Sequence, residues 1–134
     1  MRIAILTFGD RVSPRFDYAP EVLIVEIDSG RELNRKRLKM GSPEPAARVA
    51  KLKEEDVEVL ICGNIDVFSE RMVNSSGLDL IPWITGNAED AVNMMIAGEL
   101  RPGAILDVPG NRKRWRFAEG RRGCRRGRWS EDFN

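Results

Sequence analysis

Two short apolar runs in this chain are each followed by a glycine-containing loop and then by a helical pattern of apolar residues. These runs cover residues 57–62 and 78–84. A third continuous apolar run, residues 3–6, is typical of a strand buried on both faces of a sheet. Alternation of strands with helices favours parallel strands covered by helices, because parallel strands need a crossover connection.

The segment after the first long loop predicts a β-hairpin. Residues 21–28 have the composition of a strand, Ser29 and Gly30 suit a tight turn, and residues 31–40 alternate only weakly and are rich in basic side chains. A basic strand of this kind is expected at the solvated edge of a sheet. Together with the parallel strands, the hairpin predicts an α/β fold with a mixed sheet of about five strands flanked by helices.

Three helices are expected. Ser42 is a candidate N-cap with Pro43 at the first helical position, and Asp66 is a candidate N-cap of a second helix that runs to about residue 75. A third helix is expected over residues 88–97, preceded by Asn87. The side chains of the second helix expected to face the core are Val67, Phe68 and Met72.

Charge divides the chain into two parts. Residues 111–134 hold nine basic and three acidic side chains, a net charge of +6, whereas residues 1–110 carry a net charge of −5. We expect one domain over residues 1–103 and a basic, disordered tail over residues 104–134. No apolar run is long enough to cross a bilayer, so a cytoplasmic protein without a membrane partner is expected.

The most informative loops lie where the predicted parallel strands end. Ligands bind beyond the carboxyl ends of such strands, and backbone N–H groups at helix N-termini favour anions. The glycines would let a ligand approach the backbone closely. The alternative is that these loops are tight strand-to-helix turns that simply need glycine. The ligand-binding residues expected in the two loops are Gly63, Asn64, Gly86 and Asn87.

The loop after the first strand, residues 7–20, is long for a compact domain. Its two arginines would clamp an anionic ligand. The alternative is a well-packed surface loop in which Phe16 fills the core. The ligand-binding residues expected in this loop are Asp10, Arg11, Ser13, Arg15 and Phe16.

Cys62 ends a predicted strand beside a glycine and near a helix N-terminus. A thiolate there would have a lowered pKa and would ligate a soft metal, whereas the alternative is a small core residue. The chain has no histidine, so no nucleophile–base pair is visible and no enzyme is expected. A metal-dependent nuclease that uses Asp10 is a further alternative.

Several of these segments, taken in order, resemble the dinitrogenase iron-molybdenum cofactor biosynthesis family over about the first 100 residues. The segments that carry the resemblance are residues 1–6, 10–19, 59–65 and 85–100. The resemblance implies a ribonuclease H-like, three-layer fold with a mixed five-stranded sheet. It also implies a non-catalytic carrier of an iron–sulfur or iron-molybdenum-type cluster, or of an anionic precursor, that is not tightly held.

Two functional hypotheses therefore stand beside each other. In the first, the chain binds a metal cluster or an anionic small ligand and passes it to a protein partner. In the second, it is an RNA- or protein-binding adaptor that acts through its basic tail, in which arginines alternate with aromatic residues. The aromatic residues of the tail are Trp115, Phe117, Trp129 and Phe133.

Overall fold

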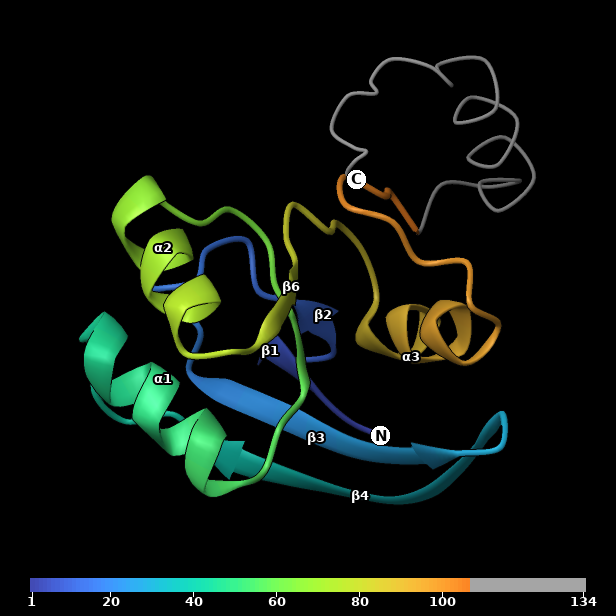
Figure 1. Cartoon of the computed structure of the whole chain (residues 1–134). Helices are drawn as coiled ribbons and strands as arrows, with labels where there is room; N and C mark the ends of the chain where they lie inside the picture. The colour runs from blue at the N-terminus through green and yellow to red at the C-terminus, as the bar shows by residue number, and fades with distance from the viewer. Residues whose placement is uncertain (107–134) are drawn as a thin grey trace.

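The structure is a computed structural model that describes residues 1–106 (Figure 1). Residues 107–134 lie outside the described part, and with them most of the expected tail. No helix within residues 1–106 is both long and apolar enough to cross a membrane.

The sheet is mixed, as the sequence predicted. Its order is β4-β3-β1-β5-β6, and β2 pairs with β1 away from this path. β1 runs parallel to β5, and β5 parallel to β6, whereas β1–β3, β3–β4 and β1–β2 are antiparallel pairs. The strands are β1 (Arg2–Phe8), β2 (Arg11–Val12), β3 (Glu21–Asp28), β4 (Arg31–Lys39), β5 (Val59–Ile61) and β6 (Asp79–Ile81). The expected five strands are present, and the two-residue β2 is a sixth.

Helices cover both faces of the sheet, which gives three layers (Figure 1). They are α1 (Pro45–Glu54), α2 (Val67–Ser75) and α3 (Ala88–Ile96). Side chains of β1 alternate between the faces because successive residues of a strand point in opposite directions. Ile3 and Ile5 pack in the cluster that contains α3, whereas Ala4 and Leu6 pack in the cluster that contains side chains of α1 and α2.

β4 is the basic edge strand that its sequence predicted, and within residues 1–106 only its neighbour β3 pairs with it. Its cations are joined to carboxylates of the body: Arg35 to Glu32 and Glu89, and Lys36 to Glu55. The paired carboxylates hold the pKa of Arg35 above its usual value, mainly through hydrogen bonds with Glu32 and then Glu89. Arg35 and Lys36 of this edge strand are therefore paired with nearby carboxylates.

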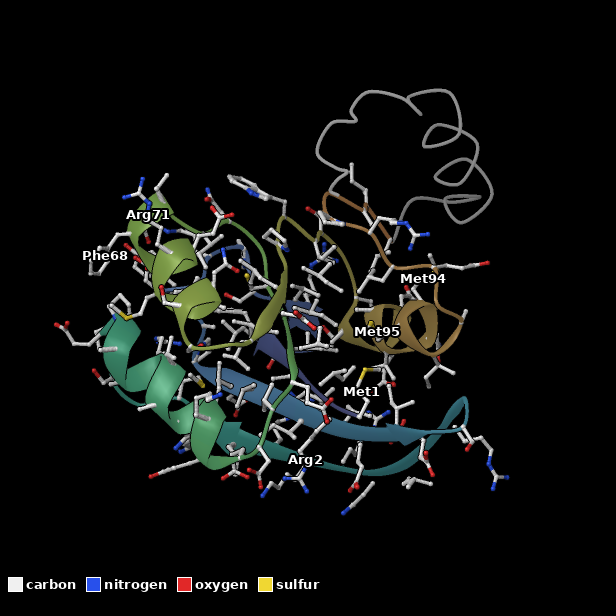
Figure 2. All side chains as sticks on the ribbon, viewed as in Figure 1. Met1, Arg2, Phe68, Arg71, Met94 and Met95 are labelled. Carbon is white, nitrogen blue, oxygen red and sulfur yellow. The ribbon has the colours of Figure 1, made fainter. Side chains whose placement is uncertain are left out.

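Two details of the expected helices are wrong. The first helix begins at Pro45 with Glu44 as N-cap, because the Ser42 hydroxyl bonds the Glu44 amide in an extended segment (3.1 Å) instead of opening the helix. In α2, Asp66 is the N-cap as expected, but Val67 and Phe68 are 63% and 64% exposed. Figure 2 shows Phe68 and Arg71 pointing outward from the helix. The buried positions of α2 are Ser69 and Val73, four residues apart, so the preceding pair lies on the solvent side.

The chain after α3 returns to the sheet. Ala104 and Leu106, which the expected boundary at residue 103 assigns to the tail, are buried in the core cluster that contains α3. The amide of Thr85 donates to the Ala104 carbonyl oxygen (3.0 Å), and the amide of Leu106 donates to the Thr85 carbonyl oxygen (2.8 Å). The domain thus extends at least to residue 106.

Candidate functional site

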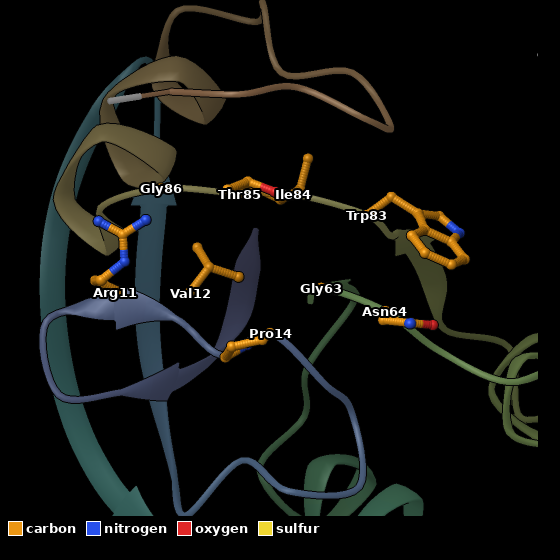
Figure 3. A pocket seen from close by; sticks show the side chains of 9 residues that line it. All are labelled: Arg11, Val12, Pro14, Gly63, Asn64, Trp83, Ile84, Thr85 and Gly86. Carbon is orange, nitrogen blue, oxygen red and sulfur yellow. The ribbon is translucent and has the colours of Figure 1, made fainter. Parts of the chain in front are cut away.

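A pocket of about 250 Å³ opens where the loops after β1, β5 and β6 meet. Figure 3 shows Arg11 and Gly86 at one end of it and Trp83 with Asn64 at the other. The residues that line it are Arg11, Val12, Pro14, Gly63, Asn64, Trp83, Ile84, Thr85 and Gly86. The position is the one that the parallel strands predicted, and the lining combines one cation with mostly apolar or backbone surface.

One wall of the pocket forms where residues 12–16 cross the loop after β5. The Asn64 amide donates to the Pro14 carbonyl oxygen and the Phe16 amide donates to the Asn64 carbonyl oxygen, both at 2.8 Å. At Gly63 this crossing is so close that a Cβ atom would lie 2.4 Å from the Ser13 carbonyl oxygen. Only glycine allows the approach, because real Cβ atoms do not come so near a backbone oxygen.

The opposite wall is the segment after β6. The Val12 amide donates to the Gly86 carbonyl oxygen (2.8 Å), which ties β2 to this segment. The Trp83 amide donates to the Gly63 carbonyl oxygen (2.9 Å) and the Ile84 amide to the Cys62 carbonyl oxygen (3.0 Å). Backbone bonds therefore fix all three loops around the pocket.

Five lining residues were not among the expected site residues, and Trp83 is the largest of them; the others are Val12, Pro14, Ile84 and Thr85. The backbone of Trp83 is left-handed, with φ of 65°, which is rare for a bulky residue. Its side chain is 52% exposed at the rim. A large aromatic residue directly after a strand and a proline was the available signal, because that position falls at the ligand-binding edge of the sheet.

Of the expected arginine clamp, Arg11 lines the pocket and Arg15 does not. The Arg15 guanidinium forms a two-point ion pair with the Asp17 carboxylate, with N–O distances of 3.2 and 3.1 Å. It also lies 4.3 Å from the centre of the Tyr18 ring, which suits a cation–π contact. Arg15 therefore stabilises its own loop.

The other expected residues of the first loop have structural contacts. Ser13 is fully buried, and its hydroxyl donates to the Arg15 carbonyl oxygen (3.0 Å). Phe16 is 1% exposed and packs in the core, as expected if this is a well-packed surface loop and not a ligand clamp. The Asp10 carbonyl oxygen accepts from the Ala88 amide at the start of α3 (2.9 Å).

The two helix N-termini beside the pocket are capped from within the chain. The Asn87 side chain accepts from the Glu89 amide (2.8 Å), and the Asp66 carboxylate accepts from the Ser69 amide (3.1 Å). These bonds, with that to Ala88, occupy N–H groups that the sequence analysis assigned to an anion. The carboxylate at α2 also adds a negative charge at the helix end that would otherwise attract anions.

Cys62 presents its backbone to the pocket region and its thiol to the core. It is fully buried in the cluster beneath α1 and α2. Burial, with a smaller effect of the Glu70 charge, raises the pKa of the Cys62 thiol to about 12. The lowered pKa expected for this thiol is therefore wrong. Among residues 1–106, no group of three or more His, Cys, Asp or Glu side chains is placed to hold a metal ion.

Arg48 of α1 supports the first loop from beneath. Its guanidinium donates to the Ala19 carbonyl oxygen (2.8 Å) and to the Asp17 carbonyl oxygen (3.3 Å). The residue is 3% exposed, its Nε has no hydrogen-bond partner among residues 1–106, and desolvation lowers the pKa of the group. Although desolvation of the Arg48 guanidinium is unfavourable, its two hydrogen bonds to backbone carbonyl oxygens fix the path of residues 17–19.

Both a sequence profile and solved structures match this chain. The sequence profile described as "Dinitrogenase iron-molybdenum cofactor" matches residues 1–98. Among curated proteins, none matches the chain significantly.

Solved structures share the fold at low sequence identity. The crystal structure of PH0822 superposes with a TM-score of 0.71 at 20% identity, covering 76% of this chain and 96% of that one. A candidate dinitrogenase from Methanocaldococcus jannaschii gives 0.62 at 22% identity, covering 75% and 91%. The apo form of the orange protein from Desulfovibrio gigas gives 0.64 at 16% identity, covering 80% and 96%. At these identities the likeness establishes the fold.

Proposed function

Since this chain belongs to the dinitrogenase iron-molybdenum cofactor family, we propose that it is a non-catalytic carrier that binds a metal–sulfur cluster, or an anionic precursor of one, in the pocket between β2, β5 and β6. The observation that carries the proposal is the pocket itself. It lies at the ligand-binding edge of the sheet and is lined by one cation, Arg11, among apolar and glycine surface.

In this proposal the metal–sulfur cluster is bound with its own ligands in place, and no protein side chain ligates the metal. The residues described do not fit a cluster that is ligated by protein side chains, because Cys62 is buried with a raised pKa and no other group of ligands gathers. A complete anion, by contrast, needs only charge, shape and a few donors. Arg11 supplies the charge, and the Asn64 amide group and Thr85 hydroxyl are the polar side chains of the lining.

Trp83 completes the proposed site. A sulfur-rich anion spreads its charge over large, weakly hydrated atoms, so apolar and aromatic surface costs it little desolvation. The half-exposed indole at the rim provides most of that surface, since Val12 and Ile84 also line the pocket but are only 3% and 1% exposed. The same lining is poor in the donors that a small, strongly hydrated anion would require.

Binding of tetrathiomolybdate to oxygen-free protein tests the proposal. The visible absorbance of the anion after equilibrium dialysis gives its dissociation constant. We expect Arg11→Gln to weaken binding by about tenfold or more, because a charge-assisted bond contributes roughly 1.5–3 kcal/mol. Arg31→Gln, in the hairpin at the far end of the strands, is the matched control and should bind as the unchanged protein does.

Cys62→Ala separates this proposal from thiolate ligation. We expect it to bind the anion with unchanged affinity, because the thiol faces the core. Loss of binding in Cys62→Ala would favour thiolate ligation. Absence of binding in the unchanged protein, or equal affinity of Arg11→Gln, would refute the carrier site described above.

A further inference from the structure

Arg37, on the edge strand β4, reaches across the sheet to the turn that precedes Arg11. We propose that Arg37 is a positioning residue of the anion site. It does not touch the anion, and it acts by holding the turn between β1 and β2 so that Arg11 stays in the pocket. The effect on anion binding rests on the proposed function, whereas the effect on the turn does not.

Three contacts of a single nitrogen atom hold the Arg37 side chain in place. Its Nη1 donates to the Thr7 hydroxyl (3.1 Å) and to the Gly9 carbonyl oxygen (3.3 Å). The same nitrogen lies 3.5 Å from a carboxylate oxygen of Glu21. Thr7 is fully buried in β1, and Gly9 follows the last residue of that strand. The guanidinium therefore connects β4 with the end of β1 across the intervening strand β3.

The strand register explains how Arg37 reaches this far. Thr7 is the cross-strand partner of Glu21 in β3. Leu23, two residues further along β3, is the partner of Arg37. Residues that are opposite each other or two apart share one face of a sheet, so these side chains lie on one face. Because Leu23 packs in the core cluster that contains α3, the stem of the arginine lies along apolar surface while its charged end meets the turn.

The turn that Arg37 holds is short and leads directly to the cation of the pocket. Gly9 and Asp10 form a two-residue turn, since Phe8 and Arg11 are register partners on either side of it. Gly9 has φ of 66°, which suits the first position of such a turn. Because β2 consists only of Arg11 and Val12, the place of Arg11 depends on the contacts that hold the turn.

Backbone bonds hold the turn on its pocket side, and Arg37 holds it from the other side. The Asp10 carbonyl oxygen accepts from the Ala88 amide at the start of α3 (2.9 Å). Thr7 pairs with Val12 on one edge of β1 and with β3 on the other, which is the edge from which the guanidinium approaches. Loss of Arg37 thus frees one side of the turn and leaves the other attached, so we expect Arg11 to shift without loss of the fold.

Arg37 is not among the residues that line the pocket, and the Glu21 carboxylate lies beside its charge. Its influence on a bound anion therefore passes through the turn and Arg11. A positioning role of this kind makes a prediction that direct binding does not. Once Arg11 has lost its charge, its position no longer affects anion binding, and the identity of residue 37 should no longer matter.

A double-substitution cycle with tetrathiomolybdate tests the effect on binding. We expect Arg37→Met to weaken binding by about three- to tenfold, and by no more than Arg11→Gln does. Arg37→Met added to Arg11→Gln should cause no further loss, because the first residue acts through the second. Effects that multiply in the double variant would overturn the positioning role, and so would unchanged affinity of Arg37→Met.

Arg37→Lys and Lys39→Met are the matched controls. All three contacts of Arg37 belong to one nitrogen, so the single ammonium of lysine, with its three donors, is able to replace them. We expect Arg37→Lys to bind the anion within about threefold of the unchanged protein, since no two-point contact is lost. Lys39→Met removes a cation of the same strand that makes none of these contacts, and it should bind as the unchanged protein does. Equal weakening by Lys39→Met and Arg37→Met would assign the effect to net charge and overturn the proposal.

Hydrogen exchange measures the turn whether or not an anion binds. We expect Arg37→Met to speed exchange of the Ala88 amide, which bonds the Asp10 carbonyl oxygen of the turn. Exchange of the Glu58 amide, which bonds the Arg2 carbonyl oxygen at the opposite end of β1, should stay as it is. Unaltered exchange at Ala88, or equal acceleration at both amides, would overturn the role of Arg37 in the turn. If the unchanged protein binds no tetrathiomolybdate, the proposed function fails, and the exchange rates still decide whether Arg37 holds the turn.

Discussion

A Cβ atom placed on Gly63 would stand 2.4 Å from the carbonyl oxygen of Ser13 and 2.7 Å from that of Pro14. Both obstacles are backbone atoms, which cannot swing aside as a flexible side chain can. This contact between the loops after β1 and β5 sets one wall of the pocket.

Gly63→Ala is therefore expected to force the two loops apart. We expect it to lower the free energy of unfolding by about 1–3 kcal/mol, the usual cost of overpacking, and to shift the amide NMR signals of residues 12–14. Gly98→Ala is the control: its φ is 73° with no atom within 4 Å of the added Cβ, so it should cost about 1 kcal/mol of backbone strain and leave those signals in place. Equal effects of the two changes on the pocket signals would contradict the close-approach argument.

Thiol labelling should show Cys62 to be inert in the folded protein. In a Cys124→Ser background, a pKa raised from 9.0 to about 12 lowers the thiolate fraction at neutral pH about a thousandfold, and burial blocks the reagent as well. We expect negligible reaction with a chromogenic disulfide in buffer and one full equivalent in guanidinium chloride. Cys62→Ala, which keeps Cys124, reports the other thiol. Rapid reaction of folded Cys124→Ser protein would show that the structure exposes Cys62.

The same thiol predicts a loss of stability at alkaline pH. Above pH 9 the unfolded chain releases the Cys62 proton, whereas the folded chain holds it until about pH 12. The stabilisation from the buried thiol is thus complete below pH 9 and falls between pH 9 and 12, by up to about 1.4 kcal/mol per pH unit. Urea unfolding of the Cys124→Ser protein, with and without the Cys62→Ala substitution, measures this loss at about pH 8, 10 and 11.

We expect the stability advantage of Cys62 over the Cys62→Ala substitution to shrink across these three pH values. Other titrating groups affect both proteins alike, so they cancel in the difference. A difference that stays constant over the whole range would show that the thiol does not stay protonated on folding.

Arg48→Met should loosen the loop that carries the expected clamp. The change leaves the carbonyl oxygens of Asp17 and Ala19 without their donor, which costs about 1–3 kcal/mol of stability. We expect faster hydrogen exchange at the Phe16 amide, which bonds the Asn64 carbonyl oxygen in the same loop crossing. Lys53→Met, an exposed position of α1, is the control and should change neither quantity. If Arg48→Met is as stable as the unchanged protein, the buried guanidinium does not position the loop.

The sequence was sufficient for the elements whose patterns are local. The hairpin from β3 to β4 was expected because Ser29 and Gly30 are residue types that suit a tight turn. In the structure they take the positive φ values, 53° and 74°, that such a turn requires. The caps of α2 and α3 at Asp66 and Asn87 followed from side chains that bond the first amides of their helices. The mixed sheet, and the edge at which its parallel strands end, followed from the alternation of strands and helices, whereas the strand order was not predicted.

The rest depended on packing that no local pattern contains. Cys62 directly follows β5, a strand buried on both faces, and it continues the alternation of that strand: Val59 and Ile61 pack in one core cluster, and Leu60 and Cys62 in the other. Phe68 was expected inside for its apolarity, yet the buried face of α2 is set by Ser69 and Val73. Trp83 adopts a left-handed backbone that its residue type disfavours, so its place at the rim follows only from the tertiary fold.

The bond between Leu106 and Thr85 has a consequence for any group that follows in the chain. Whatever is tethered after residue 106 starts at the pocket wall, so its encounter with the pocket is intramolecular. Short tethers give effective concentrations in the range of about 1 mM or more. The Met1 ammonium, by contrast, donates to the Ile27 carbonyl oxygen beside the hairpin turn. A group fused to the N-terminus would therefore not start at the pocket wall.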